Sequence, residues 1–310
     1  MCVSPQSPLF DRSMETLVEC AAAVNRGATD PQVFFQYARA LWNVRDLDGT
    51  MAALDRAITG SPPLSKADLS LAYSARSICH HQLRHPEQAT ADANAALEAD
   101  PRPHVYTLRA ITLMVQGRLD EAIADAEEGV RLDPRDWETR AFRGLIHLER
   151  HEYAAAIEDF TWVIEDGRCE KYASELYLGR ARAYLALGDP CAAEADCTVG
   201  IDEDYHEQSH WPFIVRSRAA QAQTAYLIRA EARLALGQLP RALGDCYWAA
   251  SIAPGDPAVY DLRSRIFYEL HNLPEAVNDT IRAAHLRKSS APEPEQFAPS
   301  LEPMLAATLG

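Results

Sequence analysis

Residues 103–136 carry a pattern of apolar and polar positions that recurs along the chain. Apolar residues recur three and four apart in its first half, at Val105, Leu108, Ile111 and Val115. Gly117 suits the left-handed conformation that ends a helix, and a second periodic run follows over residues 119–132. Pro134 cannot continue this run because it lacks an amide hydrogen. The pattern predicts a hairpin of two helices, which needs neighbouring hairpins to bury its apolar face.

The same hairpin pattern can be placed seven times along the chain. The repeats start near Pro31, Ser70, Pro103, Trp137, Ser174, Gln223 and Pro257. Small residues occupy the eighth place of each repeat, at Ala38, Ser77, Ala110, Gly144, Ala181, Ala230 and Ser264. Small residues also occupy the twentieth place, at Thr50, Ala89, Ala122, Ala156, Ala193, Ala242 and Ala276. Such residues let two helices approach closely, so the pattern predicts seven stacked hairpins.

An aromatic at the fourth place, small residues at the eighth and twentieth, glycine at the fifteenth and proline at the thirty-second resemble the tetratricopeptide repeat family. In the third repeat these residues are Tyr106, Ala110, Ala122, Gly117 and Pro134. The resemblance covers roughly residues 31–288. It implies an all-α, right-handed superhelical solenoid of seven helix hairpins with short terminal caps.

The solenoid is expected to occupy residues 31–288, between two segments of other character. Residues 1–30 are predicted to hold an N-terminal capping helix, over Ser13–Arg26. Residues 289–310 read as a Pro-rich tail that ends in the apolar segment 304–309. An insert at about residues 204–222 lengthens one interval between repeats.

A second register pairs charges between the two helices of a hairpin. The seventh place of repeats two to seven is Arg76, Arg109, Arg143, Arg180, Arg229 and Arg263. Sixteen residues further on stand Asp92, Asp125, Asp159, Asp196, Asp245 and Asp279. In the first repeat both places change together, to Tyr37 and Ala53. We expect six ion pairs, because a buried arginine must be neutralised; an arginine ladder that binds anions is the alternative.

The insert carries the segment His206-Glu207-Gln208-Ser209-His210, which matches the HExxH pattern of zinc metalloproteases. Pro212 stands two residues beyond His210, no apolar helix precedes the segment, and no third ligand motif stands downstream. We therefore expect no catalytic residues, no metal and no cofactor, and interpret the segment as an exposed polar loop. One long helix is predicted over residues 213–236, with a loop folded back on the solenoid as the alternative.

Charge and cysteine usage limit the classes of partner. The net charge of −15 disfavours nucleic acid, whose binding needs clustered Lys and Arg. Without a run of about 18 apolar residues, the sequence predicts no membrane span and a cytoplasmic protein. Seven scattered cysteines without a CxxC pair are typical of reduced thiols, and Cys197 and Cys246 fall at buried places of the repeat.

In the family that the chain resembles, the first helices line a concave groove that binds ligands. Lys and Asn at the fifth and ninth places, with which some members clamp a terminal carboxylate, are absent here. The residues at the ligand-facing places chosen as the candidate groove are Phe35, Arg39, Trp42, Ile78, Ile111, Met114, Leu145, Leu148, Leu178, Arg182, Leu185, Leu227, Glu231 and Arg265. These residues predict a groove with an apolar middle and charge towards both ends.

The sequence thus predicts a non-enzymatic scaffold that binds a peptide or amphipathic helix of another protein. Two alternatives remain: an enzyme or a small-molecule or metal-binding protein centred on the insert, and a structural module that self-associates through its ends or its long helix. The partner is expected to be apolar or amphipathic. The acidic charge is interpreted as a contribution to solubility, with a basic partner as the alternative. The chain's own C-terminal tail is a further candidate occupant of the groove.

Overall fold

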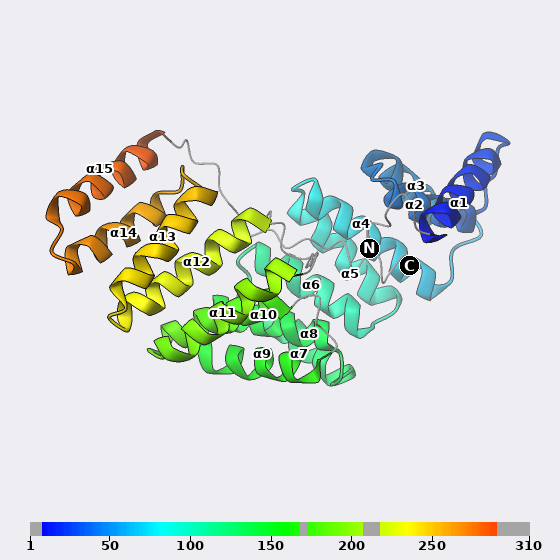
Figure 1. Ribbon diagram of the computed structural model, residues 1–310. Coiled ribbons are helices and arrows are strands. Elements are labelled where there is room, and N and C mark those ends of the chain that lie inside the picture. The colour runs from blue at the N-terminus through cyan, green and yellow to red at the C-terminus, as the bar shows by residue number, and fades with distance from the viewer. Residues whose placement is uncertain (1–7, 168–172, 207–217, 290–310) are drawn as a thin grey trace. The chain divides into compact units, whose positions relative to one another are not determined.

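The computed structural model describes residues 8–167, 173–206 and 218–289. The chain divides into two units, unit 1 up to Arg135 and unit 2 from Asp136. Over the described residues both units are entirely α-helical, with fifteen helices in all (Figure 1). The predicted all-α fold of paired hairpins is confirmed.

Unit 1 contains the first seven helices. They are α1 (Pro8–Asn25), α2 (Pro31–Asn43), α3 (Leu47–Thr59), α4 (Lys66–Gln82), α5 (Pro86–Ala99), α6 (Pro103–Val115) and α7 (Leu119–Leu132). Helices α2 to α7 form three hairpins, and α1 packs against α2. The N-terminal helix begins at Pro8, five residues before its predicted start, because proline is tolerated in the first helical turn.

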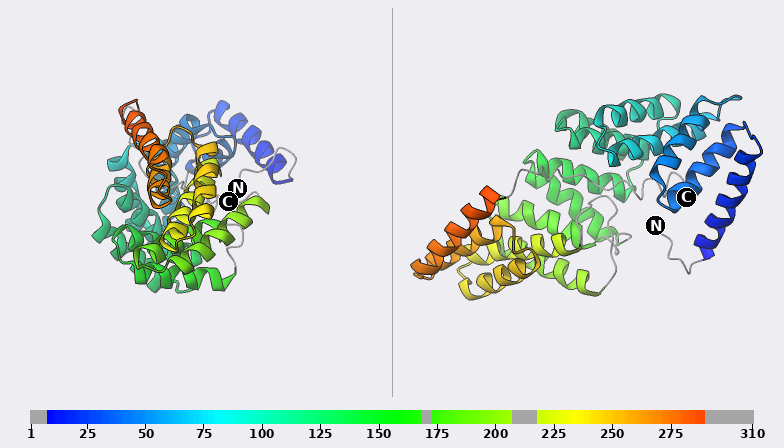
Figure 2. Two further views of the ribbon diagram at one scale, coloured as in Figure 1. Left: turned by 60° about the vertical axis from the view of Figure 1, so that its left-hand side comes forward. Right: turned by 90° about the horizontal axis from the view of Figure 1, so that it is seen from above.

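Unit 2 contains the other eight helices. They are α8 (Trp137–Glu149), α9 (Tyr153–Asp166), α10 (Ala173–Ala186), α11 (Pro190–His206), α12 (Arg218–Ala235), α13 (Leu239–Ile252), α14 (Pro257–Glu269) and α15 (Leu273–Ser289). They form four hairpins, and each packs beside the next along the unit (Figure 2). Of the long helix predicted over residues 213–236, the structure describes only α12, and residues 213–217 lie outside the described residues.

Helix starts follow local capping chemistry. The side chains of Asp30, Asp136 and Asp256 accept hydrogen bonds from backbone amides two residues on, at 2.9, 3.1 and 2.8 Å. Pro31 and Pro257 then occupy the first turn of α2 and α14, where a missing amide hydrogen costs nothing. Polar capping residues before an apolar run therefore explain where these first helices begin.

Each described hairpin turns through one residue in the left-handed region. Gly117 has φ +73°, as its place in the pattern predicts, and Gly188 and Gly237 follow it. The other four hairpins use residues with a side chain at this place, with φ between 57° and 63°, at Arg45, Arg84, His151 and His271. The turn geometry is thus constant although the residue is not.

The core of each hairpin lies where the small residues meet. Six of the seven eighth-place residues are buried, and Ser264 is partly buried. All seven twentieth-place residues are buried as well. In the α8–α9 hairpin a Cβ atom added at Gly144 would lie 2.9 Å from the ring of Phe160, which is itself fully buried. Small residues therefore set how closely the two helices pack.

Candidate protein-binding surface

An arginine of the first helix pairs with an aspartate of the second helix in repeats two to seven. In each pair Nε and Nη2 both donate to the carboxylate, at distances of 2.6 to 3.2 Å. All six aspartates are buried, and in the first repeat Ala53 occupies the corresponding buried place. The six predicted ion pairs are confirmed.

These pairs belong to the scaffold. The hydrogen bond to the partner aspartate raises the pKa of Arg109, Arg180 and Arg263 above its ordinary value. The two parallel donors of each guanidinium are used within the hairpin. Its positive charge there neutralises a buried carboxylate. This arrangement favours the structural role over the anion-binding ladder.

The same arginines also contact the preceding repeat within each unit. The contacted residue stands two places after the preceding repeat's aspartate, or after Ala53 in the first repeat. The Nη1 atoms of Arg76, Arg109, Arg180 and Arg229 donate to Asp55, Asn94, Thr161 and Thr198, at 2.7 to 3.5 Å. Arg263 instead lies over the ring of Tyr247, 5.1 Å from its centroid. The repeat pattern does not reveal these links, because the spacing from each contacted residue to the next arginine varies with loop length.

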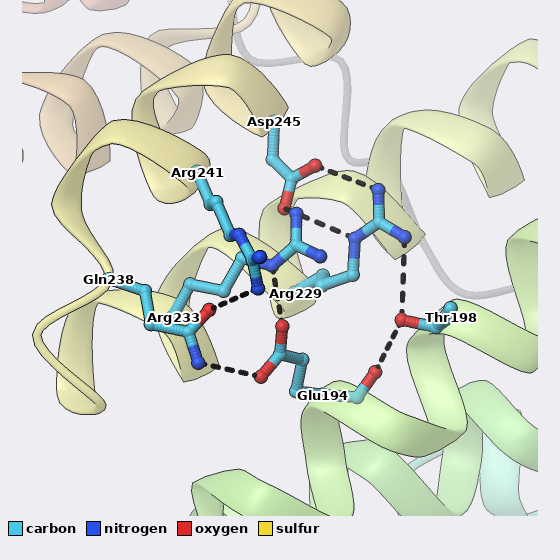
Figure 3. Close-up of polar contacts among 7 residues, drawn as sticks. All are labelled: Glu194, Thr198, Arg229, Arg233, Gln238, Arg241 and Asp245. Carbon is cyan, nitrogen blue, oxygen red and sulfur yellow. Dashed lines mark hydrogen bonds and ion pairs between the residues drawn. The ribbon is translucent and has the colours of Figure 1, made fainter.

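The junction that follows the insert has a larger polar network (Figure 3). Arg233 of α12 donates to Glu194 of α11 and to Asp245 of α13, both at 2.8 Å. Gln238 also donates to Glu194, at 3.1 Å. Hydrogen bonding from Arg233 lowers the pKa of Glu194. This network ties α12 and α13 to α11 although the chain between α11 and α12 is long.

Most apolar residues of the predicted groove are buried. The buried members are Phe35, Ile78, Ile111, Met114, Leu145, Leu148 and Leu178. These side chains pack inside the protein, because the places that face ligand in the family also pack on neighbouring helices. The apolar stripe expected at ligand-facing places is therefore not exposed along these seven residues. The ligand-binding role of the whole set stays a prediction.

The other members of the set are accessible to solvent. Arg39, Trp42, Leu185 and Leu227 are partly exposed, and Arg182, Glu231 and Arg265 are exposed. In unit 2 the exposed charges pair between neighbouring first helices. Arg182 of α10 lies 3.6 Å from Glu149 of α8, and Arg265 of α14 lies 3.3 Å from Glu231 of α12. In unit 2, accessible members of the set therefore lie on the first helices α10, α12 and α14.

An open pocket of about 650 Å³ lies beside α14, the last first helix of unit 2. Leu234 of α12 and Leu239 of α13 contribute apolar lining, and Arg265 and Tyr268 come from α14. Leu273 of α15 also lines the pocket. Tyr268 is 64% exposed, so an aromatic residue is presented to solvent beside an apolar lining. Tyr268 occupies the twelfth place of its repeat, as Met114, Leu148 and Leu185 of the candidate groove do in theirs.

The metal motif of the insert lies outside what the structure describes. His206 is the last residue of α11, and residues 207–210 are not among the described residues. Within the described ranges, no group of three or more His, Cys, Asp or Glu side chains could hold a metal ion. Cys197 and Cys246 are fully buried, as predicted, and burial raises the pKa of both thiols to about 12. Among the described helices, none has the length and apolar character to cross a membrane.

Comparison with known proteins supports the repeat pattern. A family model for the tetratricopeptide repeat matches residues 80–137 and 143–204. No curated protein matches the sequence of this chain.

Several solved structures share the fold. A tetratricopeptide repeat protein from Parabacteroides merdae ATCC 43184 is 17% identical, with a TM-score of 0.60 over 90% of this chain and 99% of that chain. The Cut9–Hcn1 hetero-tetramer of the APC/C gives 14% identity and a TM-score of 0.66, over 82% of this chain and 46% of that chain. PilW, a type IV pilus biogenesis factor, gives 14% identity and a TM-score of 0.60, over 74% and 96%.

These identities are too low to carry a ligand or a partner from one protein to another. The helix hairpins, the repeat register and the family match nevertheless agree with one another. Residues 80–137 and 143–204 are therefore tetratricopeptide repeats, and the helix hairpins of the described residues share the fold of that family.

Proposed function

We propose that this protein is a scaffold that binds a peptide or amphipathic helix of another protein along the first helices of unit 2. Tetratricopeptide repeat proteins are typically modules for protein–protein interaction. The proposal rests on one observation: Tyr268 and Arg265 are both exposed and line the same pocket, beside apolar residues. Tyrosine and arginine supply much of the binding energy at protein interfaces.

The chemistry of this surface suits an amphipathic partner. Leu185, Leu227 and Leu234 are partly exposed and offer apolar contact along α10 and α12. The ion pair between Arg265 and Glu231 is half open to water, with 60% and 52% of the two side chains exposed. Such a pair is weakly held, so its members are available to charged groups of a ligand. A helix with one apolar face and a charged flank meets both features.

The test uses peptides selected for binding to the full chain from a random peptide library. Calorimetry should show that Tyr268→Ala raises the Kd of a selected peptide by about tenfold or more, because an exposed aromatic beside an apolar pocket acts as an anchor. Tyr247→Ala is the matched control, since Tyr247 is a similarly exposed tyrosine of α13, a second helix. Peptide affinity unchanged in both Tyr268→Ala and Arg265→Glu would reject this surface.

A further inference from the structure

We propose that the α15 face of the last hairpin is a dimer interface, on which α15 of a second copy of this chain packs in the antiparallel direction. Figures 1 and 2 show α15 as the outermost helix of unit 2, with α14 on its inner side. Leu273, Val277 and Ile281 stand four residues apart and form one stripe along α15. Their exposed fractions are 56%, 55% and 62%.

Residues of earlier hairpins that correspond to Leu273 and Val277 are partly covered. Leu239 and Leu243 occupy in α13 the places that Leu273 and Val277 occupy in α15, and both are partly buried. Met51 and Ile157, at the place of Val277, are partly buried too. Those helices are followed within their units by the first helix of another repeat. The stripe on α15 is thus built like an internal contact surface, and its apolar area gains stability when it is covered.

Ile281 indicates that the occupant is not another repeat of the same kind. At this place Asp55, Asn94, Thr161 and Thr198 accept a hydrogen bond from the arginine of the following repeat. Isoleucine has neither an acceptor nor an aromatic ring like that of Tyr247 under Arg263, so an arginine placed over it would make neither contact. The occupant therefore presents an apolar side chain opposite Ile281. The stripe of a second copy does so, because it carries Leu273 and Val277 there.

Charge at the two ends of the stripe is self-complementary. Glu269 lines the pocket together with Leu273 and Val277, at the start of the stripe. Lys288 stands seven residues after Ile281, on the same face of α15 and at the other end. Both side chains are exposed. A two-fold antiparallel pairing brings Lys288 of one copy towards the partner's Glu269, twice in each dimer. This complementarity selects a second copy over other apolar helices.

Analytical ultracentrifugation of the full chain tests the proposal, over a range of roughly 1 to 200 µM because dimers depend on protomer concentration. The wild-type protein should dimerise, and Ile281→Asp should be monomeric over the same range. Leu187→Asp is the matched control, since Leu187 is a similarly exposed leucine in the turn after α10, and it should leave the dimer intact. Circular dichroism should show unchanged helix content, because both substitutions are at exposed positions.

A charge exchange tests the direction of pairing. Lys288→Glu should raise the dimer dissociation constant at least about threefold, and adding Glu269→Lys should restore it. A monomeric wild-type protein at every concentration would overturn the proposal and leave the stripe to the chain's own residues 304–309 or to another protein. A dimer that Ile281→Asp does not weaken would overturn it as well. Leu273, Val277 and Glu269 also line the pocket beside Tyr268, so a dimer would cover part of that pocket. Peptide binding is therefore measured on Ile281→Asp as well, because Ile281 is not among the lining residues and the two proposals are then tested separately.

Discussion

At the scale of single residues, the six Arg–Asp pairs are the most regular feature of the protein. In each pair the arginine donates two parallel hydrogen bonds to a buried carboxylate. Five of the six arginines also contact the preceding repeat of their unit. One side chain thus links three helices. An arginine is suited to this task because its planar group has donors on several edges, whereas a lysine has a single charged centre.

Removal of one of these arginines should expose the cost of an unpaired buried charge. Asp159 is 1% exposed, and Arg143→Ala would leave its carboxylate without two hydrogen bonds. We expect a loss of about 3 kcal/mol in the free energy of unfolding, measured by urea denaturation.

Arg140, 3.6 Å from Asp159, remains in this variant and keeps part of the attraction. Arg118→Ala is the control, because it breaks an exposed ion pair with Glu121 and should change stability far less. Equal effects of the two substitutions would show that the buried pair contributes no more than a surface pair.

At the scale of the helix hairpin, two rules hold over all seven repeats. The turn places one residue in the left-handed region, and the small eighth- and twentieth-place residues bring the helices together. The first rule is met by glycine in three hairpins and by Arg45, Arg84, His151 and His271 in the others. Since a left-handed conformation disfavours residues with a Cβ atom, the packing of the two helices imposes it at these four places.

Two helical glycines should respond oppositely to alanine. In Gly144→Ala the new methyl group would meet the buried ring of Phe160 at 2.9 Å, and the strain should outweigh the gain in helix propensity. We expect a net loss of about 1 to 2 kcal/mol on urea unfolding.

Gly244 of α13 has no atom within 4 Å of an added Cβ. Gly244→Ala should therefore stabilise the protein by about 0.5 to 1 kcal/mol. A stabilising Gly144→Ala would mean that Phe160 moves aside at little cost, which would contradict the role assigned to the small residue.

At the scale of the whole molecule, the net charge of −15 makes pH a global variable. Protonation of carboxylates reduces self-repulsion as the pH falls. One carboxylate adds a specific effect: burial, followed by the nearby charge of Asp136, raises the pKa of Glu138 to about 7. Between pH 4.5 and 7 the folded protein therefore binds a proton at Glu138 that an unfolded chain has released.

This difference predicts a pH-dependent gap between wild type and Glu138→Gln. The stability contributed by protonated Glu138 is fully present below about pH 4.5 and is lost as the pH rises through 7, because the raised pKa belongs to the folded state. From pH 5 to pH 8 the wild type should lose on the order of 1 to 3 kcal/mol relative to Glu138→Gln in urea titrations.

Glu127→Gln, an exposed carboxylate of α7, is the control and should track the wild type. The general charge effect is nearly the same in all three proteins, so it cancels in the comparison. A constant gap between wild type and Glu138→Gln across this pH range would contradict the raised pKa.

The sequence by itself determined the features that lie within one hairpin. Helix periodicity, the glycine turn at Gly117, the small interface residues and the Arg–Asp pairs all depend on fixed spacings within a repeat, so a single chain displays them. The resemblance to the tetratricopeptide repeat family followed from the same spacings. The metal motif over residues 206–210 and the tail after Ser289 remain predictions, because residues 207–210 and 290–310 lie outside the residues that the structure describes.

Only the tertiary structure decided which side chains water reaches. Ile111 and Leu145 occupy ligand-facing places yet are buried, whereas Tyr268, Leu273 and Ile281 are open to solvent. The burial of a side chain depends on the helices stacked beside it as well as on its place in the repeat. The links between repeats were likewise hidden, since loops of different length separate the contacting residues. Local spacing therefore specified the hairpin, and the stacking of hairpins specified the surface.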